Sequence, residues 1–468
     1  MKDQHLAKRV LKWVVPVRDN EIRAVVLSTL FFFLLFAGYY PLRALRETMG
    51  VESGVSTIPL LWTCTLVVML LINPIYAWIV SRYPRRVFIP FVYRFFLLNL
   101  IIFFALSKLL PQEVHVYLGR TFYVWLSVFN LFVVSVAWGF IDDIFSSAQG
   151  KRLFGFVASG ASIGGLVGSA FTIYLADKID PINVMIFSIV MIEASAQCIR
   201  PLDRVAKTVR GAKQSTADER KAQYDAPIRG TMWDGMKRVA SSRYLLSICL
   251  FMFFLSLTGT FLYMVQADIA ADYFDDRSSR VVFFARINLL VNGIAAVIQI
   301  FVTARFMKSF GVGVTLGLLP IIAVVAFAGL GFALLTAQIG LIFWVFIIAQ
   351  VGRRAGSYAL ARPSREVLYT VVPRQDKYKS KTFIDTFITR ASDQVNVWGF
   401  QGLMAMKLSA AAIMFVAVPL AAGWFVLALA LGARQNRLAK FPRCGTCGYD
   451  LRGGHERCPE CGAVSDAR

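Results

Sequence analysis

Twelve apolar segments, each long enough to cross a lipid bilayer, follow one another along this chain of 468 residues. A helix that spans a bilayer needs about 20 mostly apolar residues. Hydrophobic residues make up 57% of the sequence and charged residues only 17%, a balance that excludes an ordinary soluble globule. We therefore predict an all-α polytopic membrane protein with about twelve transmembrane helices. The segments are centred near Leu34, Val67, Leu98, Phe129, Gly164, Ile189, Leu255, Asn292, Val324, Val345, Arg390 and Val418.

The segment "TFIDTFITRASDQVNVWGF", residues 382–400, has the weakest hydropathy of the twelve. When each residue is placed about 100° further round a helix, its polar and apolar residues separate onto opposite sides. This pattern predicts a helix with one face toward a polar cavity and one toward lipid. The polar side contains Thr382, Asp385, Thr386, Thr389, Ser392, Asp393 and Asn396. The apolar side contains Phe383, Ile384, Phe387, Ile388, Val395 and Trp398.

Basic residues predict the orientation in the membrane. The N-terminal tail and the stretch from Arg200 to Arg243 are rich in Lys and Arg, and the positive-inside rule places such segments in the cytoplasm. We expect a multi-pass protein of the inner (cytoplasmic) membrane with both termini cytoplasmic. The net charge of +22 is then an orientation signal at an anionic lipid surface. Nucleic-acid binding is not expected, because the basic residues are scattered over many loops.

The long polar stretch after the sixth segment divides the predicted helices into two sets of six. Short basic turns, "WIVSRYPRRVF" and "FVTARFMKSFGVGV", occupy corresponding places in the two sets and indicate an internal repeat around a midplane site. The predicted parts are a cytoplasmic tail (1–22), a six-helix bundle (23–198), a basic cytoplasmic linker (199–243), a second six-helix bundle (244–433) and a C-terminal zinc ribbon (441–463).

The C-terminal ribbon is predicted from "CGTCGYDLRGGHERCPEC", which contains two CxxC pairs. Four thiolates at this spacing suit a tetrahedral structural zinc ion, and a unit this short would fold with the metal. Disulfides or separate thiols are the alternative, although a cytosolic location keeps thiols reduced. The ribbon is also a possible contact for a cytosolic protein partner. The expected ligands are Cys444, Cys447, Cys458 and Cys461.

The end of the first helix, "YYPLRALRE", is the first candidate substrate site. Tyr39, Arg43 and Glu47 are four residues apart on one face, and Arg46 lies beside them. Charged residues inside spans tend to face the bundle interior and mark substrate paths. A guanidinium group there can hold phosphate or carboxylate with two hydrogen bonds. The alternative is that the arginines reach out to the membrane surface.

Two features of the fourth and fifth helices have structural or gating interpretations. Asp142 and Asp143 are expected to pair with Lys151 and Arg152 in a cytoplasmic gate, with a direct role for Asp142 at the substrate site as the alternative. Glycines recur every four residues in "GFVASGASIGGLVGSA", at Gly160, Gly164 and Gly168, and this spacing lets two helices approach closely. A nucleotide-hydrolysing phosphate loop is excluded, since the flanking "QGKR" lacks its upstream glycine and its Ser or Thr.

Polar residues of the second half complete the candidate site. Asn288, Asn292 and Gln299 share a face of the eighth helix and Gln266 lies in the seventh, where they contact either substrate or one another. In the eleventh helix we expect Thr389, Arg390 and Asp393 to face the cavity, and Asp385 to gate or couple. No nucleophile with a neighbouring base is evident, so an enzyme is not expected.

Four blocks of the sequence resemble a known family. "YYPLRALRETMGVESG", "FNLFVVSVAWGFIDDIFSSAQGKRLFGFVASGASIGGLVG", "FFARINLLVN" and "RPSREVLYTVVPRQDKYKSKTFIDT" are similar to bacterial relatives of the ATP/ADP translocases, nucleotide exchangers of the major facilitator superfamily. The resemblance covers residues 23–431 and implies twelve helices, alternating access and exchange of ATP for ADP or uptake of other nucleotides. The zinc ribbon departs from the usual exchanger. The matching charged positions are Arg43, Arg46, Arg365, Glu366, Lys379, Lys381 and Asp385.

These observations predict a secondary active transporter of nucleotides or a related phosphorylated anion. One alternative is a carrier for another organic anion or solute, proton-coupled through Asp142 or Asp385. A second alternative is a membrane scaffold or sensor that does not transport and acts through its zinc ribbon. The expected partners are the lipid bilayer, an anionic small-molecule substrate and a cytosolic protein at the ribbon.

Overall fold

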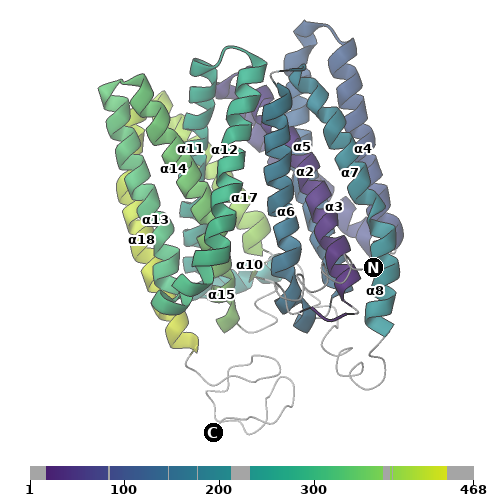
Figure 1. Ribbon diagram of the computed structural model, residues 1–468. Coiled ribbons are helices and arrows are strands. Elements are labelled where there is room, and N and C mark those ends of the chain that lie inside the picture. The colour runs from purple at the N-terminus through teal and green to yellow at the C-terminus, as the bar shows by residue number, and fades with distance from the viewer. Residues whose placement is uncertain are drawn as a thin grey trace. The chain divides into compact units, whose positions relative to one another are not determined.

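The computed structural model describes residues 17–19, 21–82, 85–145, 147–176, 178–211, 232–372, 380–381 and 383–439. All regular elements in these ranges are helical (Figure 1). Eleven of the helical runs are long and apolar enough to cross a membrane, and they contain eleven of the twelve predicted centres. The protein is therefore a multi-pass membrane protein. The run near Arg390 does not meet the same criterion, so the twelfth span stays a prediction.

The described helices belong to two compact units. The first unit contains the helices from α2 to α8 together with residues 267–293, which form the end of α11 and most of α12. Its own helices are α2 (Ile22–Glu52), α3 (Ile58–Arg82), α4 (Arg85–Leu109), α5 (His115–Ile144), α6 (Ser147–Ala176), α7 (Val184–Gln197) and α8 (Ile199–Gly211). The helices that pass from one unit into the other are α11 (Arg243–Tyr273) and α12 (Arg277–Ile298).

The second unit contains α10, the first part of α11, the end of α12 and the elements that follow it. These include three π-helical turns, η4 (Gln299–Thr303), η5 (Ser357–Ala361) and η7 (Ile384–Ile388). Its α-helices are α10 (Met232–Ser241), α13 (Ala304–Thr336), α14 (Ile339–Gly356), α15 (Arg362–Leu368), α17 (Thr389–Ala405) and α18 (Ala410–Ala439). Short 3₁₀ turns occur in both units. The first unit contains η1 (Val55–Thr57), η2 (Gln112–Val114) and η3 (Pro181–Asn183), and the second contains η6 (Tyr369–Val371).

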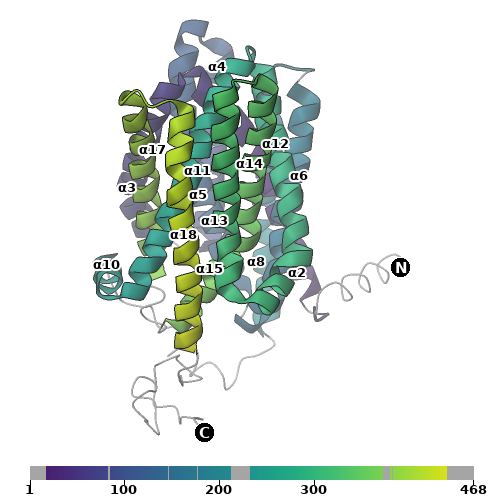
Figure 2. The same cartoon turned by 90° about the vertical axis from the view of Figure 1, so that its left-hand side faces the viewer.

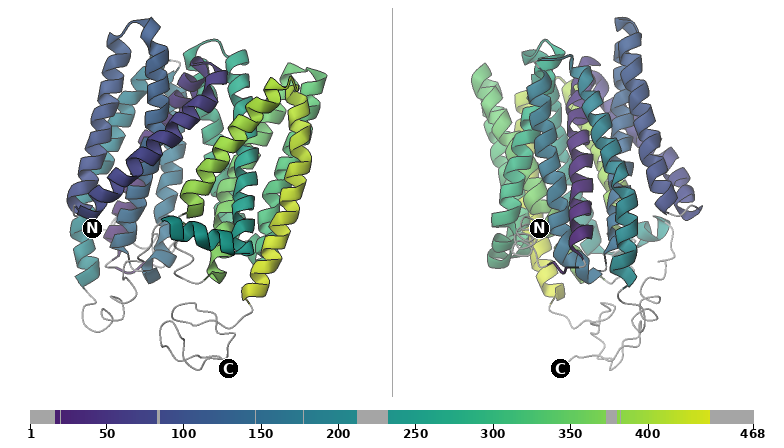
Figure 3. Two further views of the ribbon diagram at one scale, coloured as in Figure 1. Left: turned by 180° about the vertical axis from the view of Figure 1, so that it is seen from behind. Right: turned by 45° about the vertical axis from the view of Figure 1, so that its right-hand side comes forward.

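In the first unit, α2 is the central helix. It contacts α5, α6 and α7, and the right-hand view in Figure 3 shows it between α6 and α7. The glycines of α6 face the α2 backbone directly, as their four-residue spacing predicted. A Cβ atom added to Gly160, Gly164 or Gly168 would lie 2.3, 2.2 or 2.4 Å from the carbonyl oxygens of Thr29, Phe33 and Ala37, respectively. Only residues without a side chain allow this approach.

In the second unit, α13 and α18 pack side by side along their length (Figure 2). Their backbones come into contact at Gly432, where an added Cβ would lie 2.1 Å from the Cα of Gly313. A sharp bend in α13 occurs at Gly311, whose φ of 80° is a conformation that glycine adopts readily. The short amphipathic helix α10 lies across the long helices of this unit (Figure 3, left).

The eleventh predicted helix corrects one part of the sequence interpretation. Phe383 and Ile384 are buried, although the helical pattern placed them toward lipid. Further along, Val395 and Trp398 are exposed as expected. The π-helical turn η7 begins at Ile384 and contains one residue more than an α-helical turn, so the residues before and after it do not follow one uniform 100° rotation.

Candidate functional site

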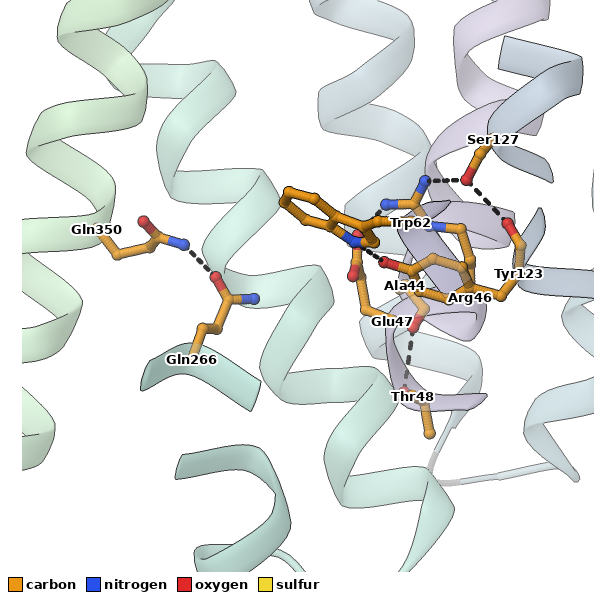
Figure 4. Close-up of polar contacts among 9 residues, drawn as sticks. All are labelled: Ala44, Arg46, Glu47, Thr48, Trp62, Tyr123, Ser127, Gln266 and Gln350. Carbon is orange, nitrogen blue, oxygen red and sulfur yellow. Dashed lines mark hydrogen bonds and ion pairs between the residues drawn. The ribbon is translucent and has the colours of Figure 1, made fainter. Parts of the chain in front are cut away.

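Arg46 is held in place within the first unit by side chains of its own helix α2 and of α5 (Figure 4). Its Nη1 donates a hydrogen bond of 3.1 Å to Ser127 Oγ, and its Nη2 forms an ion pair with Glu47. The guanidinium carbon lies 4.9 Å from the centre of the Tyr123 ring, whose hydroxyl accepts a hydrogen bond of 2.9 Å from Trp62 Nε1. A ring, a hydroxyl and a carboxylate therefore fix the position of this guanidinium.

Arg43 lies one turn before Arg46 on α2, and its guanidinium carbon is 5.9 Å from the centre of the Tyr40 ring. The Tyr40 hydroxyl donates a hydrogen bond of 2.8 Å to Asn292 Oδ1, which connects α2 to α12 within the first unit. Tyr39 and Tyr40 are both buried, and the Tyr39 ring stacks on Phe129. Tyr40, which the sequence pattern did not select, meets the polar side chain of α12, and a substrate contact of Tyr39 stays a prediction.

Asp393 connects α17 to α11 within the second unit. One carboxylate oxygen accepts a hydrogen bond of 2.6 Å from Ser256 Oγ, and the other is 3.5 Å from Arg390 Nη1. Asn396 Nδ2 on α17 donates a hydrogen bond of 3.3 Å to the carbonyl oxygen of Phe253, which also lies on α11. The hydroxyl of Thr389 donates to the carbonyl of Ile384 in the π-helical turn, so it serves the local backbone.

A second group of charges lies where α15 meets the start of the eleventh segment. Arg365 Nη1 is 3.3 Å from Asp385 Oδ1, and Arg365 Nη2 is 3.8 Å from Glu366 Oε1. Lys381 Nζ is 2.6 Å from Glu366 Oε2. The structure thus brings together four charged residues that the family resemblance had selected. Their part in gating stays a prediction.

Several predicted residues cannot be placed with their side chains. Asp142 and Asp143 lie in α5, and Lys151 and Arg152 lie in α6, but the described side chains do not include these four. Lys379 and the whole C-terminal ribbon also fall outside the described residues. The predicted zinc ligands Cys444, Cys447, Cys458 and Cys461 are among them.

Two arginines that were not predicted, Arg353 and Arg354, lie near the end of α14. Arg354 is buried, and the guanidinium of Arg353 lies against Gly259 of α11. One turn earlier, Gln350 donates a hydrogen bond to Gln266 (Figure 4). The signal that could have identified the arginines is their position in "IIAQVGRRAGSYALA", where a double positive charge interrupts an apolar run.

Ion pairs also connect helix ends in the first unit. Arg277 at the start of α12 holds both carboxylate oxygens of Glu52 at the end of α2, with both contacts 2.7 Å long. Nearby, Asp180 Oδ2 is 2.6 Å from Lys108 Nζ. Partial burial raises the pKa of Asp180, but its hydrogen bonds and the positive charge of Lys108 outweigh this and lower the pKa overall.

The helix arrangement and the charges inside the spans define a polytopic membrane transporter. The sequence model of the Major Facilitator Superfamily matches residues 22–361, so the chain belongs to that family. It is 20% identical to ADP,ATP carrier protein 2 of Chlamydia pneumoniae over 471 residues, covering 86% of each chain. It is 23% identical over 460 residues to ADP,ATP carrier protein 1 of Chlamydia trachomatis, covering 86% of this chain and 87% of the relative. The predicted family resemblance is confirmed.

Solved structures show the same fold at low sequence identity. An inward-facing bacterial homologue of the iron transporter ferroportin has a TM-score of 0.59 and 10% identity, with 88% of this chain and 98% of that chain covered. The xylose transporter XylE from E. coli, in a partially occluded inward-open conformation, also has a TM-score of 0.59 and 10% identity, with 89% and 98% covered. These similarities concern the fold alone.

Proposed function

We propose that this protein exchanges nucleotides of the ATP/ADP type, or a related phosphorylated anion, by alternating access. The observation that carries the proposal is the pair of arginines on α2, Arg43 and Arg46, each lying over a tyrosine ring inside a membrane span. Charged residues are costly in a span and mark substrate paths. The names of the curated relatives, ADP,ATP carrier proteins, support a nucleotide as the substrate.

The surroundings of Arg46 suit reversible anion binding. Glu47 compensates its charge in the substrate-free protein, so the site need not hold an isolated charge in a medium of low dielectric constant. A phosphate group that approaches the guanidinium competes with this carboxylate and gains two charge-assisted hydrogen bonds. Arg43 adds a second positive group one turn away, as a polyphosphate requires.

Ion pairs of the second unit supply candidates for gating or coupling. Arg365 and Asp385 pair near one end of the eleventh segment, whereas Arg390 and Asp393 pair further along it. Each pair can break and reform as the carrier changes state. The predicted gate of Asp142, Asp143, Lys151 and Arg152 belongs to the same proposal.

We further propose an inner-membrane location with cytoplasmic termini, on the distribution of basic residues. The same orientation places the zinc ribbon in the cytosol, where four cysteines can hold a structural zinc ion and a protein partner can reach it.

Counter-exchange in liposomes tests the transport proposal. Purified protein is reconstituted with ADP inside, and labelled ATP is added outside. Uptake should require internal ADP and should fall by about tenfold or more in Arg43→Ala and Arg46→Ala, since each loses a charged hydrogen-bonding group. Arg94→Ala is a matched control, because Arg94 is exposed and pairs with Glu193 at 3.4 Å. Folded wild-type protein that transports another anion, but never a nucleotide, would refute the substrate assignment.

A further inference from the structure

We propose that Arg353 of α14 is a second anion-binding residue, which takes a phosphate or another oxyanion of the substrate within the second unit. The proposal rests on the proposed function and extends it to a part of the chain that neither the sequence pattern nor the family resemblance had selected. It stands on the surroundings of Arg353, on the charge balance around α11 and on a neighbouring polar atom.

Arg353 lies inside a membrane span without a balancing acid. In the part of the chain that the structure describes, its guanidinium forms neither a hydrogen bond nor an ion pair, and its Nε is shielded from solvent. The residue as a whole keeps intermediate exposure, so the described protein does not cover its side chain completely. A buried cation without a counterion is costly, and such residues persist where an anion completes the site.

Gly259 of α11 makes room for this guanidinium. A Cβ atom added there would lie 3.1 Å from Arg353 Nη1 and 3.4 Å from Cζ, which is closer than most side chains allow. The glycine therefore lets the flat group rest against the backbone of α11. This arrangement covers one face of the guanidinium, whereas its N–H donors point outward in the plane of the group, where a ligand would accept from them.

The charges that lie against the middle of α11 favour an anion. Arg353 of α14 lies against Gly259, and Arg390 of α17 pairs with Asp393, which accepts a hydrogen bond from Ser256 of α11. Asp393 contributes one negative charge, and both of its oxygens already have partners, Ser256 and Arg390. The remaining positive charge attracts an anion and, in a site of low dielectric constant, binds it more strongly than in water.

Gln350 provides a polar contact one turn from Arg353. Its amide group donates to Gln266, while its Oε1 is buried and accepts no hydrogen bond in the described structure. Three residues correspond to about 4.5 Å along a helix. A ligand that places an oxyanion on Arg353 and a hydroxyl or amino group near Gln350 would satisfy both groups. Phosphorylated sugars and nucleotides carry this combination.

The test combines ligand binding with thermal stability in detergent. Purified wild-type protein, Arg353→Gln and Arg353→Lys are melted with and without ADP, inorganic pyrophosphate or citrate, and adenosine serves as the uncharged probe. We expect anions, but not adenosine, to raise the melting temperature of the wild type. Arg353→Gln should weaken that binding by about tenfold or more, and Arg353→Lys should weaken it less.

The melting temperature without ligand separates a binding role from a structural one. Arg353→Gln removes an uncompensated charge, so it should leave the ligand-free protein as stable as the wild type or make it more stable. If Arg353 were needed only for folding, Arg353→Gln would lower the melting temperature of the ligand-free protein. Arg434→Gln is the control, because this exposed arginine of α18 has the same chemistry. Gly259→Ala retains the charge but crowds the guanidinium, and should weaken anion binding to an intermediate degree.

The outcomes distinguish this inference from the proposed function. If the wild type binds an anion through Arg353 but exchanges no nucleotide, the residue assignment stands and the nucleotide substrate is wrong. If Arg353→Gln exchanges nucleotides and responds to anions as the wild type does, the assignment of Arg353 is overturned while the transport proposal stands. If no anion raises the melting temperature of the wild type, the assignment of Arg353 as an anion-binding residue is also overturned.

Discussion

The contact between α2 and α6 allows a quantitative test with one substitution at two places. A Cβ atom on Gly164 would lie 2.2 Å from the carbonyl oxygen of Phe33 and 3.0 Å from the amide nitrogen of Ala37. Both neighbours are backbone atoms, so they cannot rotate away as a side chain would. The two helices would have to separate by about 1 Å, and overpacking of this kind costs about 1–3 kcal/mol.

Gly155 provides the matched control in the same helix. It is exposed, and no atom outside its own helix lies within 4 Å of the place where a Cβ would be added. Alanine there should gain up to about 1 kcal/mol from its higher helix propensity. The same Gly→Ala change is therefore expected to lower the free energy of unfolding at Gly164 and to raise it slightly at Gly155, with a difference of about 1–4 kcal/mol.

Reversible unfolding in mixed micelles, followed by tryptophan fluorescence, would measure this difference. Both variants should be compared with the wild type in the same detergent, because detergent changes absolute stability. Equal effects at the two positions, or a Gly164→Ala protein more stable than the wild type, would show that the helices are not in backbone contact.

Three further predictions concern other parts of the chain. The pKa of Asp180 is lowered in the folded protein, so the ionised carboxylate stabilises the folded state. The wild type should therefore be more stable than Asp180→Asn above about pH 4, and this difference should shrink as the pH falls further. Melting temperatures measured across that pH range, with Lys108→Ala for comparison, would test this. Tyr40→Phe removes a buried hydrogen bond to Asn292 and should lower the unfolding free energy by about 1–3 kcal/mol, measurable in the same micelles. Cys444→Ser should abolish a stoichiometric zinc content in metal analysis of the purified protein.

Hydropathy predicted the spans well because the bilayer imposes a length and an apolar composition that the sequence must show directly. The glycine pattern predicted a close helix contact for a similar reason, since the four-residue period places small residues on one face. Neither inference needs knowledge of the partner helix. The structure adds that α2 is that partner.

Details that depend on packing could not be predicted from the sequence. The π-helical turn η7 adds one residue to the helix, so a uniform 100° rotation assigned Phe383 and Ile384 to the wrong face. Tyr39 and Tyr40 are adjacent and chemically identical, and only the position of α12 shows that Tyr40 meets a polar partner. Arg353 was not selected from the sequence, and the structure places it inside one long run in which α14, η5 and α15 continue without a break.

The membership of residues 267–293 in the first unit has a consequence for dissecting the protein into fragments. A fragment that ends in the basic linker would lack the groups that Glu52 and Tyr40 contact on α12, and would expose the surfaces that this segment covers. Two fragments cut at the linker would have to reassemble by complementation, with the second one supplying a helical hairpin to the first. The boundaries of this segment lie inside α11 and α12, so no single cut in a connecting segment follows the packing of the two units.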